Sequence, residues 1–370
     1  MMSMRLLWFA VLGLACSDDA KYSVEPGAMV DGLRSSETNV TSGSEGTVTL
    51  RIPFVEMDSS VLLTLKSNAL LSLETVYDGD GNILLDSLDW YGEEQALTDA
   101  IYADANDVVL NWPIRDSDQQ LSAGDWEFTF ATLNDLGVYK SDYDVSVYTQ
   151  IKEDENVNAG TISVTIGLTP DTEGDADILE GVHAAAACWQ DMWSDFGLEV
   201  SINWIAVALD PALPYPISSA EIEQIAAEGT ERDILMLIGE TINDDEGTLG
   251  LAGSIPGALI ETERSAVVIS WLENAGIDAV FDAEEVQIMC ETMAHETGHY
   301  LGLYHPVESD FLEWDALQDT PMCQDEWDCE DQMSDNLMYP YPICSSSGCV
   351  NQVELSSGQQ GVIQRYTGTL

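Results

Sequence analysis

The sequence HETGHYLGLYH, residues 295–305, holds three of the four histidines in this 370-residue chain. On a helix, His295 and His299 project from the same face, because residues four apart lie one turn above each other. Gly302 lacks a Cβ atom and can end that helix in a left-handed turn, which brings His305 back toward the same point. The spacing therefore predicts that the three imidazoles bind one zinc ion.

Glu296 lies directly beside these candidate ligands in the sequence. Three nitrogen ligands leave the fourth position of a tetrahedral zinc ion to a water molecule, whose pKa the metal lowers toward neutrality. A neighbouring glutamate can take the proton as that water attacks a polarised carbonyl group. We therefore expect Glu296 to act as general base and then as proton donor in the hydrolysis of peptide bonds. The fourth histidine, His183, is expected to be an ordinary residue of an amphipathic helix.

The motif resembles that of the metzincin clan of zinc endopeptidases at every defining position, HExxHxxGxxH. The resemblance implies a methionine in a tight turn beneath the metal, and Met338 is placed as that residue should be. Several members of the clan also carry a tyrosine two residues after the methionine, where it stabilises the oxyanion of the reaction. Pro340 occupies that position here, so its neighbours Tyr339 and Tyr341 are the candidates for this role.

Within the clan, the pappalysin branch is the most similar. The likeness is carried by residues 315–321, which end in Asp319-Thr320-Pro321, and by the segment LSSGQQ at 355–360. It implies a catalytic domain over about residues 158–370, built from a twisted mixed sheet with packed helices. It also implies that the β-rich run at 265–271 borders the cleft and pairs with the backbone of a peptide substrate.

The order of sequence patterns predicts an α+β protein with an all-β sandwich before the catalytic domain. Residues 17–44 are polar and are expected to form a flexible tether. Residues 45–152 contain short β-rich runs between turn signals, which is typical of an antiparallel sandwich. Strands and helices then alternate, and the helix with the histidines is expected to begin at Asp282, with Glu285 completing a capping box. The β-rich runs lie at 47–54, 61–65, 83–85, 108–112, 126–133 and 143–151.

The first sixteen residues have the features of an export signal. Arg5 precedes an apolar stretch, residues 6–15, that is too short to span a bilayer. Cys16 follows Leu-Gly-Leu-Ala, which resembles a bacterial lipobox, and lipidation there would anchor the chain to a membrane. Gly13 and Ala15 equally suit ordinary cleavage after Ala15. We therefore expect an exported protein, either a lipoprotein of the bacterial cell surface (outer membrane) or a secreted one.

Six cysteines remain besides Cys16, an even number that suits disulfides in an oxidising compartment. Two of them lie on expected helices that pack together in the metzincin fold, and the others are close enough in sequence to close two small loops. The predicted pairs are Cys188 with Cys290, Cys323 with Cys329, and Cys344 with Cys349.

The formal charge of −56, from 67 acidic and 11 basic residues, excludes nucleic acid as a partner. Peptides or proteins are the expected substrates. Calcium is a second candidate cofactor. It could bind at residues 78–82, although these read first as a hairpin turn, or, as the pappalysin resemblance implies, in the acidic stretch 308–335, which reads equally as a solvated loop. Two alternative functions stay open: a surface lipoprotein that binds a ligand and has a structural metal site, and a zinc hydrolase of non-peptide substrates.

Overall fold

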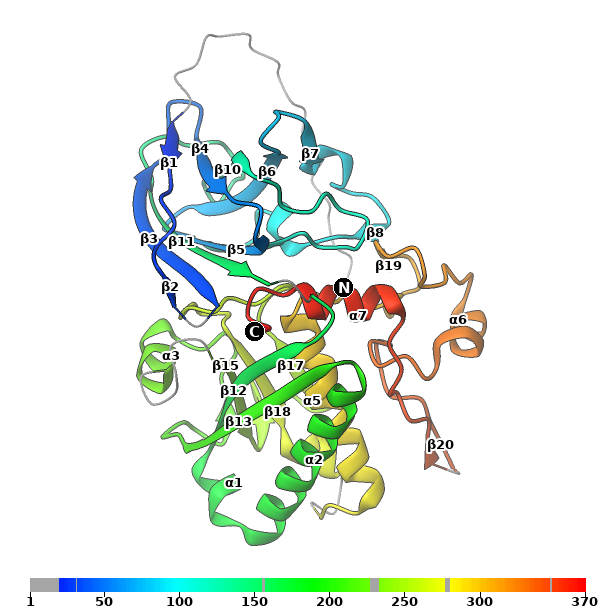
Figure 1. Ribbon diagram of the computed structural model, residues 1–370. Coiled ribbons are helices and arrows are strands. Elements are labelled where there is room, and N and C mark those ends of the chain that lie inside the picture. The colour runs from blue at the N-terminus through cyan, green and yellow to red at the C-terminus, as the bar shows by residue number, and fades with distance from the viewer. Residues whose placement is uncertain (1–19, 31, 155–156, 227–232, 277–279, 347) are drawn as a thin grey trace.

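The computed structural model describes residues 20–370 apart from 31, 155–156, 227–232, 277–279 and 347. The expected signal peptide and Cys16 lie outside the described residues. Two β-sheets form the N-terminal part of the molecule, and a third sheet with helices forms the C-terminal part (Figure 1). The predicted α+β class is therefore confirmed. No described helix combines the length and apolarity that crossing a membrane would require.

The N-terminal part is a sandwich of two five-stranded sheets. One sheet has the order β1-β4-β10-β6-β7 and the other β2-β3-β11-β5-β9, and every pair is antiparallel except β1 with β4. The first sheet contains β1 (Lys21–Ser23), β4 (Thr47–Phe54), β6 (Leu70–Tyr77), β7 (Ile83–Asp86) and β10 (Gly124–Leu133). The second contains β2 (Met29–Val30), β3 (Leu33–Thr41), β5 (Asp58–Ser67), β9 (Asp107–Trp112) and β11 (Asp144–Glu153).

The flexible tether predicted at 17–44 is wrong, because three strands of the sandwich lie in it. β3 pairs with β11 over nine residues, from Leu33 opposite Lys152 to Thr41 opposite Asp144. Only Leu33 and Val40 of this strand are buried, so its sequence is polar although its backbone is fully paired. The sandwich therefore begins near Lys21 and not at residue 45. A further strand, β6, was also not among the expected β-rich runs.

The third sheet has the order β13-β12-β15-β18-β17, with only β17 antiparallel to its neighbour. Its central strands are buried on both faces. In β15 the side chains of Met236 and Ile238 face one hydrophobic cluster, and those of Leu235 and Leu237 face another. The strands are β12 (Gly160–Leu168), β13 (Leu198–Ala206), β15 (Ile234–Gly239), β17 (Gly250–Ala252) and β18 (Ala266–Ser270).

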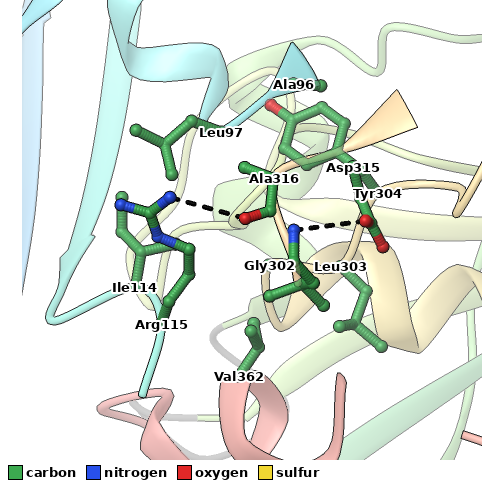
Figure 2. Close-up of a pocket in the computed structure, with 11 residues that line it drawn as sticks. Ala96, Leu97, Ile114, Arg115, Gly302, Leu303, Tyr304, Asp315, Ala316 and Val362 are labelled. Atoms are coloured by element: carbon green, nitrogen blue, oxygen red, sulfur yellow. Dashed lines mark hydrogen bonds between the residues drawn. The ribbon is translucent and has the colours of Figure 1, made fainter. Parts of the chain in front are cut away.

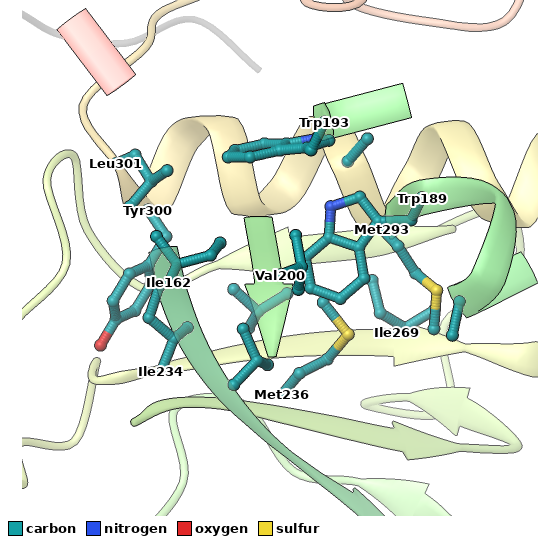
Figure 3. Packing of buried hydrophobic residues seen from close by; sticks show 14 of the residues in the cluster. Ile162, Trp189, Trp193, Val200, Ile234, Met236, Ile269, Met293, Tyr300 and Leu301 are labelled. Atoms are coloured by element: carbon teal, nitrogen blue, oxygen red, sulfur yellow. The ribbon is translucent and has the colours of Figure 1, made fainter. Parts of the chain in front are cut away.

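The helices α2 (Ala176–Asp195) and α5 (Ala283–Tyr300) cover one face of this sheet, and α3 (Ser219–Ala226) covers the other. Figure 3 shows Trp189 and Trp193 of α2 packed with Met293 of α5 against Met236 and other residues of the sheet. The disulfide between Cys188 and Cys290 joins the two helices. The remaining helices are α1 (Pro170–Gly174), α4 (Trp271–Ala275), α6 (Glu326–Met333) and α7 (Ser357–Arg365).

Six short strands and two 3₁₀ helices complete the described part of the fold. β14 (Ala212–Leu213) pairs with β16 (Thr241–Ile242), and β20 (Cys344–Ser345) pairs with β21 (Gly348–Cys349). The 3₁₀ helices η1 (Ser87–Asp89) and η2 (Asp99–Ile101) lie in the sandwich. β8 (Gln95–Ala96) of the sandwich pairs with β19 (Trp314–Asp315), so the two parts share a small sheet.

The run at 265–271 was predicted to border the cleft, and this is wrong. β18 lies between β15 and β17, with neighbours on both sides. The edge strands of the sheet are β13 and β17, and β17 is the one that packs beside α5. β17 has three residues, one of them a glycine, so it is too short to stand out as a pattern in the sequence. The edge beside the helix with the histidines is therefore at residues 250–252.

Candidate metal centre

Helix α5 begins with the capping box expected from the sequence. The Asp282 side chain accepts hydrogen bonds from the backbone N–H groups of Glu284 and Glu285, and the Glu285 side chain accepts one from the Asp282 N–H. Met289 and Met293 are fully buried on the core face. The helix is thus fixed at its start and along its side, and its last two turns carry His295 and His299.

The end of α5 is a Schellman motif centred on Gly302. Gly302 has a φ of +113°, its N–H donates to the His299 carbonyl at 2.9 Å, and the Leu303 N–H donates to the Gly298 carbonyl at 3.0 Å. The glycine is needed here, because L side chains rarely adopt this φ. The chain turns back after it, as the sequence predicted, and His305 approaches the other two histidines.

The ring nitrogens of the three histidines converge. Nε2 of His305 lies 3.1 Å from Nε2 of His295 and 3.1 Å from Nε2 of His299. Three nitrogens bound to a tetrahedral zinc ion at about 2.0–2.1 Å would lie about 3.3 Å apart. The spacing therefore fits one divalent metal ion bound by all three nitrogens. Among the histidine, cysteine and acidic side chains that the structure describes, these three histidines form the cluster that is close enough to hold such an ion.

The opposite nitrogen of each ring faces an acceptor. Nδ1 of His295 lies 2.7 Å from the Leu337 carbonyl, and Nδ1 of His299 lies 2.6 Å from the Leu303 carbonyl. A carbonyl oxygen only accepts, so both Nδ1 atoms must carry the proton, and Nδ1 of His305 likewise faces the Glu308 carboxylate at 2.9 Å. In the neutral rings each of the three Nε2 atoms then carries a lone pair. Lone pairs 3.1 Å apart repel each other, and a cation between them removes that repulsion.

His295 and His299 are held in the neutral form that binds a metal. Burial, together with the positive charge that His305 would carry, lowers the pKa of His295 to about 3. Burial, with the same repulsion from the other two rings, also holds the pKa of His299 well below its usual value. Neutral imidazole is the ligand form of histidine, so the site is prepared for a metal and not for a proton.

Glu296 lies between this cluster and the edge of the sheet. Its side chain is 9% exposed and accepts a hydrogen bond from the backbone N–H of Ala252 in β17. Gly250 permits the close approach, because a Cβ atom there would lie 2.7 Å from Cγ of Glu296. Burial raises the pKa of Glu296 to about 8, and a divalent cation beside it would lower that pKa again.

Met338 packs beneath the histidine helix. It is fully buried, and its sulfur lies only 2.7 Å from the place that a Cβ atom on residue 298 would occupy, so Gly298 permits this packing. The Asn336 side chain shapes the turn, because it accepts the Met338 N–H at 2.9 Å and exchanges hydrogen bonds with the Gln359 amide at 2.8 and 3.3 Å. No local sequence pattern assigns an individual role to Asn336 or Gln359.

Asp319 fixes the N-terminus of α7. Its carboxylate accepts hydrogen bonds from the Ser356 and Ser357 hydroxyls and from the Gly358 N–H, at 3.1, 2.9 and 2.7 Å. Together with Gln359, this connects the 315–321 segment to the turn that carries Met338. The two segments that resembled the pappalysin branch are therefore joined around the metal centre.

The two candidate tyrosines pack against each other, with ring centroids 5.2 Å apart. Tyr339 is 1% exposed and belongs to a cluster with Val307, Met333 and the Cys323–Cys329 disulfide. The Tyr341 carbonyl accepts a hydrogen bond from the Gln352 side chain. The oxyanion role of either tyrosine stays a prediction.

The remaining expectations have the following outcomes. The cysteines form the three expected pairs.

Residues 78–82 form the hairpin turn between β6 and β7, in which Asp78 accepts hydrogen bonds from Asp80 and Asn82. In the acidic stretch, Asp325 and Asp328 accept hydrogen bonds within and beside α6. Calcium stays a prediction at both places. His183 lies on α2 with its ring 4.4 Å from that of Trp204.

Comparisons with known proteins give weak likenesses. No family model matches the chain, and no curated protein matches it. Among solved structures, archaemetzincin from Methanopyrus kandleri is 13% identical, covering 58% of this chain and 90% of that one, with a TM-score of 0.30. Metalloproteinase-II from Bacteroides fragilis is 12% identical, covering 50% and 61%, with a TM-score of 0.27.

A third likeness concerns a shorter domain. The pre-peptidase C-terminal domain of collagenase from Bacillus anthracis is 6% identical to this chain, covering 37% of it and 99% of that domain, with a TM-score of 0.22. TM-scores this low do not establish a shared fold. The function of the chain must be argued from its own residues.

Proposed function

We propose that this chain is a zinc-dependent endopeptidase of the metzincin type, with His295, His299 and His305 as the zinc ligands. One observation carries the proposal: three Nε2 lone pairs converge while every Nδ1 is held by an acceptor. Three histidines from one helix and the turn after it are a ligand set of catalytic zinc sites, which keep a further position open.

A bound zinc ion would polarise a carbonyl group and lower the pKa of a water molecule. Glu296 supplies the proton acceptor beside it. One carboxylate oxygen would take the proton from the attacking water and pass it to the amine that leaves when the peptide bond breaks. The hydrogen bond from the Ala252 N–H orients this carboxylate and ties it to the edge strand.

The substrate is proposed to be a peptide that pairs with β17. This strand is the edge of the sheet nearer to the histidines, and its Ala252 contacts Glu296. A peptide added along this edge would place its backbone beside the metal and the base, and main-chain pairing would accept many different side chains. The large negative charge of the chain favours cationic peptides over anionic ones.

The assignment to the pappalysin branch belongs to the same proposal. It is supported by the contacts of Asp319 with the start of α7 and of Asn336 with Gln359. Bound calcium in the acidic stretch and an oxyanion role for Tyr339 or Tyr341 are parts of this proposal that the branch would imply.

The proposed location is outside the cytoplasm. Three disulfides support it, because such bonds persist in oxidising compartments. Lipidation of Cys16, with anchoring to the outer membrane, is the more specific form of this proposal, and release as a secreted protein is its alternative.

The decisive experiment combines a zinc assay with casein digestion, using the full chain and the Glu296→Gln variant. We expect the wild-type protein to bind about one zinc per chain and to digest casein until a chelator is added. Glu296→Gln should keep the zinc and lose the digestion. A wild-type chain that binds no zinc would contradict the proposal. A chain that binds zinc without digesting casein would favour a binding protein or a hydrolase of other substrates.

A further inference from the structure

Tyr304 lies between two residues of the metal centre. The Leu303 carbonyl before it accepts the hydrogen bond from His299, and the next residue is His305. The position of Tyr304 therefore affects two of the three rings through the backbone. Its hydroxyl reaches out of the metal domain toward the sandwich, beside Ala96 (Figure 2).

The partner of that hydroxyl is a carboxylate of the sandwich. The Tyr304 hydroxyl donates to Oδ1 of Asp99 at 2.6 Å. Asp99 is the first residue of η2, whose start is capped by the Thr98 side chain. It is 205 residues away from Tyr304 in sequence, so nothing in either local pattern indicates the contact.

Asp99 is itself held at two further points by Ile255. Its Oδ2 accepts the Ile255 N–H at 3.0 Å, and its own N–H donates to the Ile255 carbonyl at 3.0 Å. Ile255 follows the edge strand β17 by three residues. One carboxylate of the sandwich thus connects the segment after β17 with the segment that carries His305.

The loop after His305 is fixed to the sandwich at its far end as well. The Trp314 N–H donates to the Glu94 carbonyl at 2.9 Å, and β19 pairs with β8. Residues 304–314 are therefore attached to the sandwich on both sides of the third histidine. A hydrogen bond to a buried carboxylate is among the stronger ones in proteins, and a surrounding with little water strengthens it further.

We propose that Asp99 of the sandwich is a positioning residue for the metal centre, acting through Tyr304 on His305. The sandwich is then a structural part of the zinc site and not only an accessory domain. This inference rests on the proposed function in one respect, that the metal is zinc.

The test is the zinc affinity of the full chain, measured by competition with a chromogenic chelator. Tyr304→Phe removes one hydroxyl and keeps the ring, and we expect it to weaken zinc binding about tenfold, at the lower end of the effect of lost supporting contacts. Asp99→Asn should weaken it as well. The double variant should lose less than the product of the two single effects, because both changes break the same contact.

The matched control is Asp107→Asn, which breaks another contact between the same two parts. Asp107 pairs with Arg264 at 3.0 Å, and among the described residues its contacts with the other part of the chain go to Arg264 and not to the residues around His305. We expect this variant to lower the unfolding temperature of the metal-free protein about as much as Tyr304→Phe does, while zinc affinity changes less than twofold. A role in stability alone would not separate the two variants in this way.

The inference is overturned if Tyr304→Phe binds zinc as tightly as the wild type, or if Asp107→Asn weakens zinc binding equally. If Tyr304→Phe does not fold, an unchanged zinc affinity in Asp99→Asn overturns it. A wild-type chain that binds no zinc contradicts the proposed function instead. A wild type that binds zinc and digests casein, with unaffected variants, contradicts only the role of Asp99.

Discussion

Oε2 of Glu308 lies 2.9 Å from Nδ1 of His305, so the third histidine is the one whose outward nitrogen faces a carboxylate instead of a backbone carbonyl. The carboxylate fixes the tautomer of the ring and increases the electron density on Nε2. Glu308 thereby acts on the metal centre without being one of its proposed ligands.

We expect Glu308→Gln to weaken zinc binding about 10- to 100-fold, as is usual when a partner of a metal-binding histidine is lost. Competition with a chelator measures the change. Asp310→Asn is the control, because Asp310 belongs to the same loop and its side chain accepts the Leu312 N–H at 3.0 Å instead of facing a histidine. Equal zinc affinities in the two variants would contradict the role given to Glu308.

The turn at Gly302 allows a second prediction. Gly302→Ala places a Cβ atom on a residue with a φ of +113° and within 3.3 Å of Val362. The strained backbone should lower the free energy of unfolding by about 1–3 kcal/mol, measured by urea denaturation of the metal-free protein.

Gly174→Ala is the matched control for this turn. Gly174 ends α1, and a Cβ atom there would meet nothing within 4 Å. Because alanine restricts the unfolded chain, this variant should be neutral or more stable by up to about 1 kcal/mol. If both glycines tolerate alanine alike, the Schellman turn does not need its glycine.

The parts of the site that the sequence predicts are those set by local spacing. Helical periodicity brings His295 and His299 together, and the capping box at Asp282 marks the start of their helix. Gly302 predicts the turn. Each of these signals lies within a few residues, where backbone geometry leaves few alternatives.

The parts that the sequence does not show depend on contacts between distant segments or on the backbone. The carbonyls of Leu337 and Leu303 orient two histidines, and any residue type would supply them. Asp99 meets Tyr304 through the packing of the sandwich against the metal domain, which no local pattern encodes. Glu308 is the exception, because an acidic residue three positions after a metal-binding histidine is a local pattern from which a contact with that histidine could be predicted.

Asp315 should make the stability of the fold depend on pH. It is 4% exposed at the wall of the pocket between the two parts, and burial raises its pKa to about 7 (Figure 2). As the pH rises, the folded chain therefore keeps a proton on this carboxyl group that the unfolded chain, in which the pKa is about 3.9, releases at a lower pH. Stability should therefore fall as the pH rises from about 4 to 7, by about 2–4 kcal/mol in total.

The variant Asp315→Asn cannot ionise, so it should lack this part of the pH dependence. The asparagine keeps an oxygen for the Thr320 hydroxyl and the Leu317 N–H, which both donate to Oδ1 of Asp315. Urea denaturation at pH 5 and pH 8 would compare the two proteins. A wild-type difference between the two pH values that persists unchanged in the variant would show that other groups cause it.

The disulfides should contribute unequally to stability, because they close loops of very different length. Cys188 and Cys290 are 102 residues apart in sequence, whereas Cys344 and Cys349 are five apart. In the chain-entropy model the long loop is worth about 4–5 kcal/mol and the short one about 2 kcal/mol. Replacing Cys188 and Cys290 by alanine also removes sulfur from a core in which Cys290 is fully buried, which adds to the cost.

We therefore expect that pair of substitutions to lower the free energy of unfolding by at least about 2 kcal/mol more than the corresponding pair at Cys344 and Cys349. Urea denaturation of both double variants without metal measures the difference. Equal losses would mean that the unfolded chain is already compact around α2 and α5, so that the link between them restricts it little.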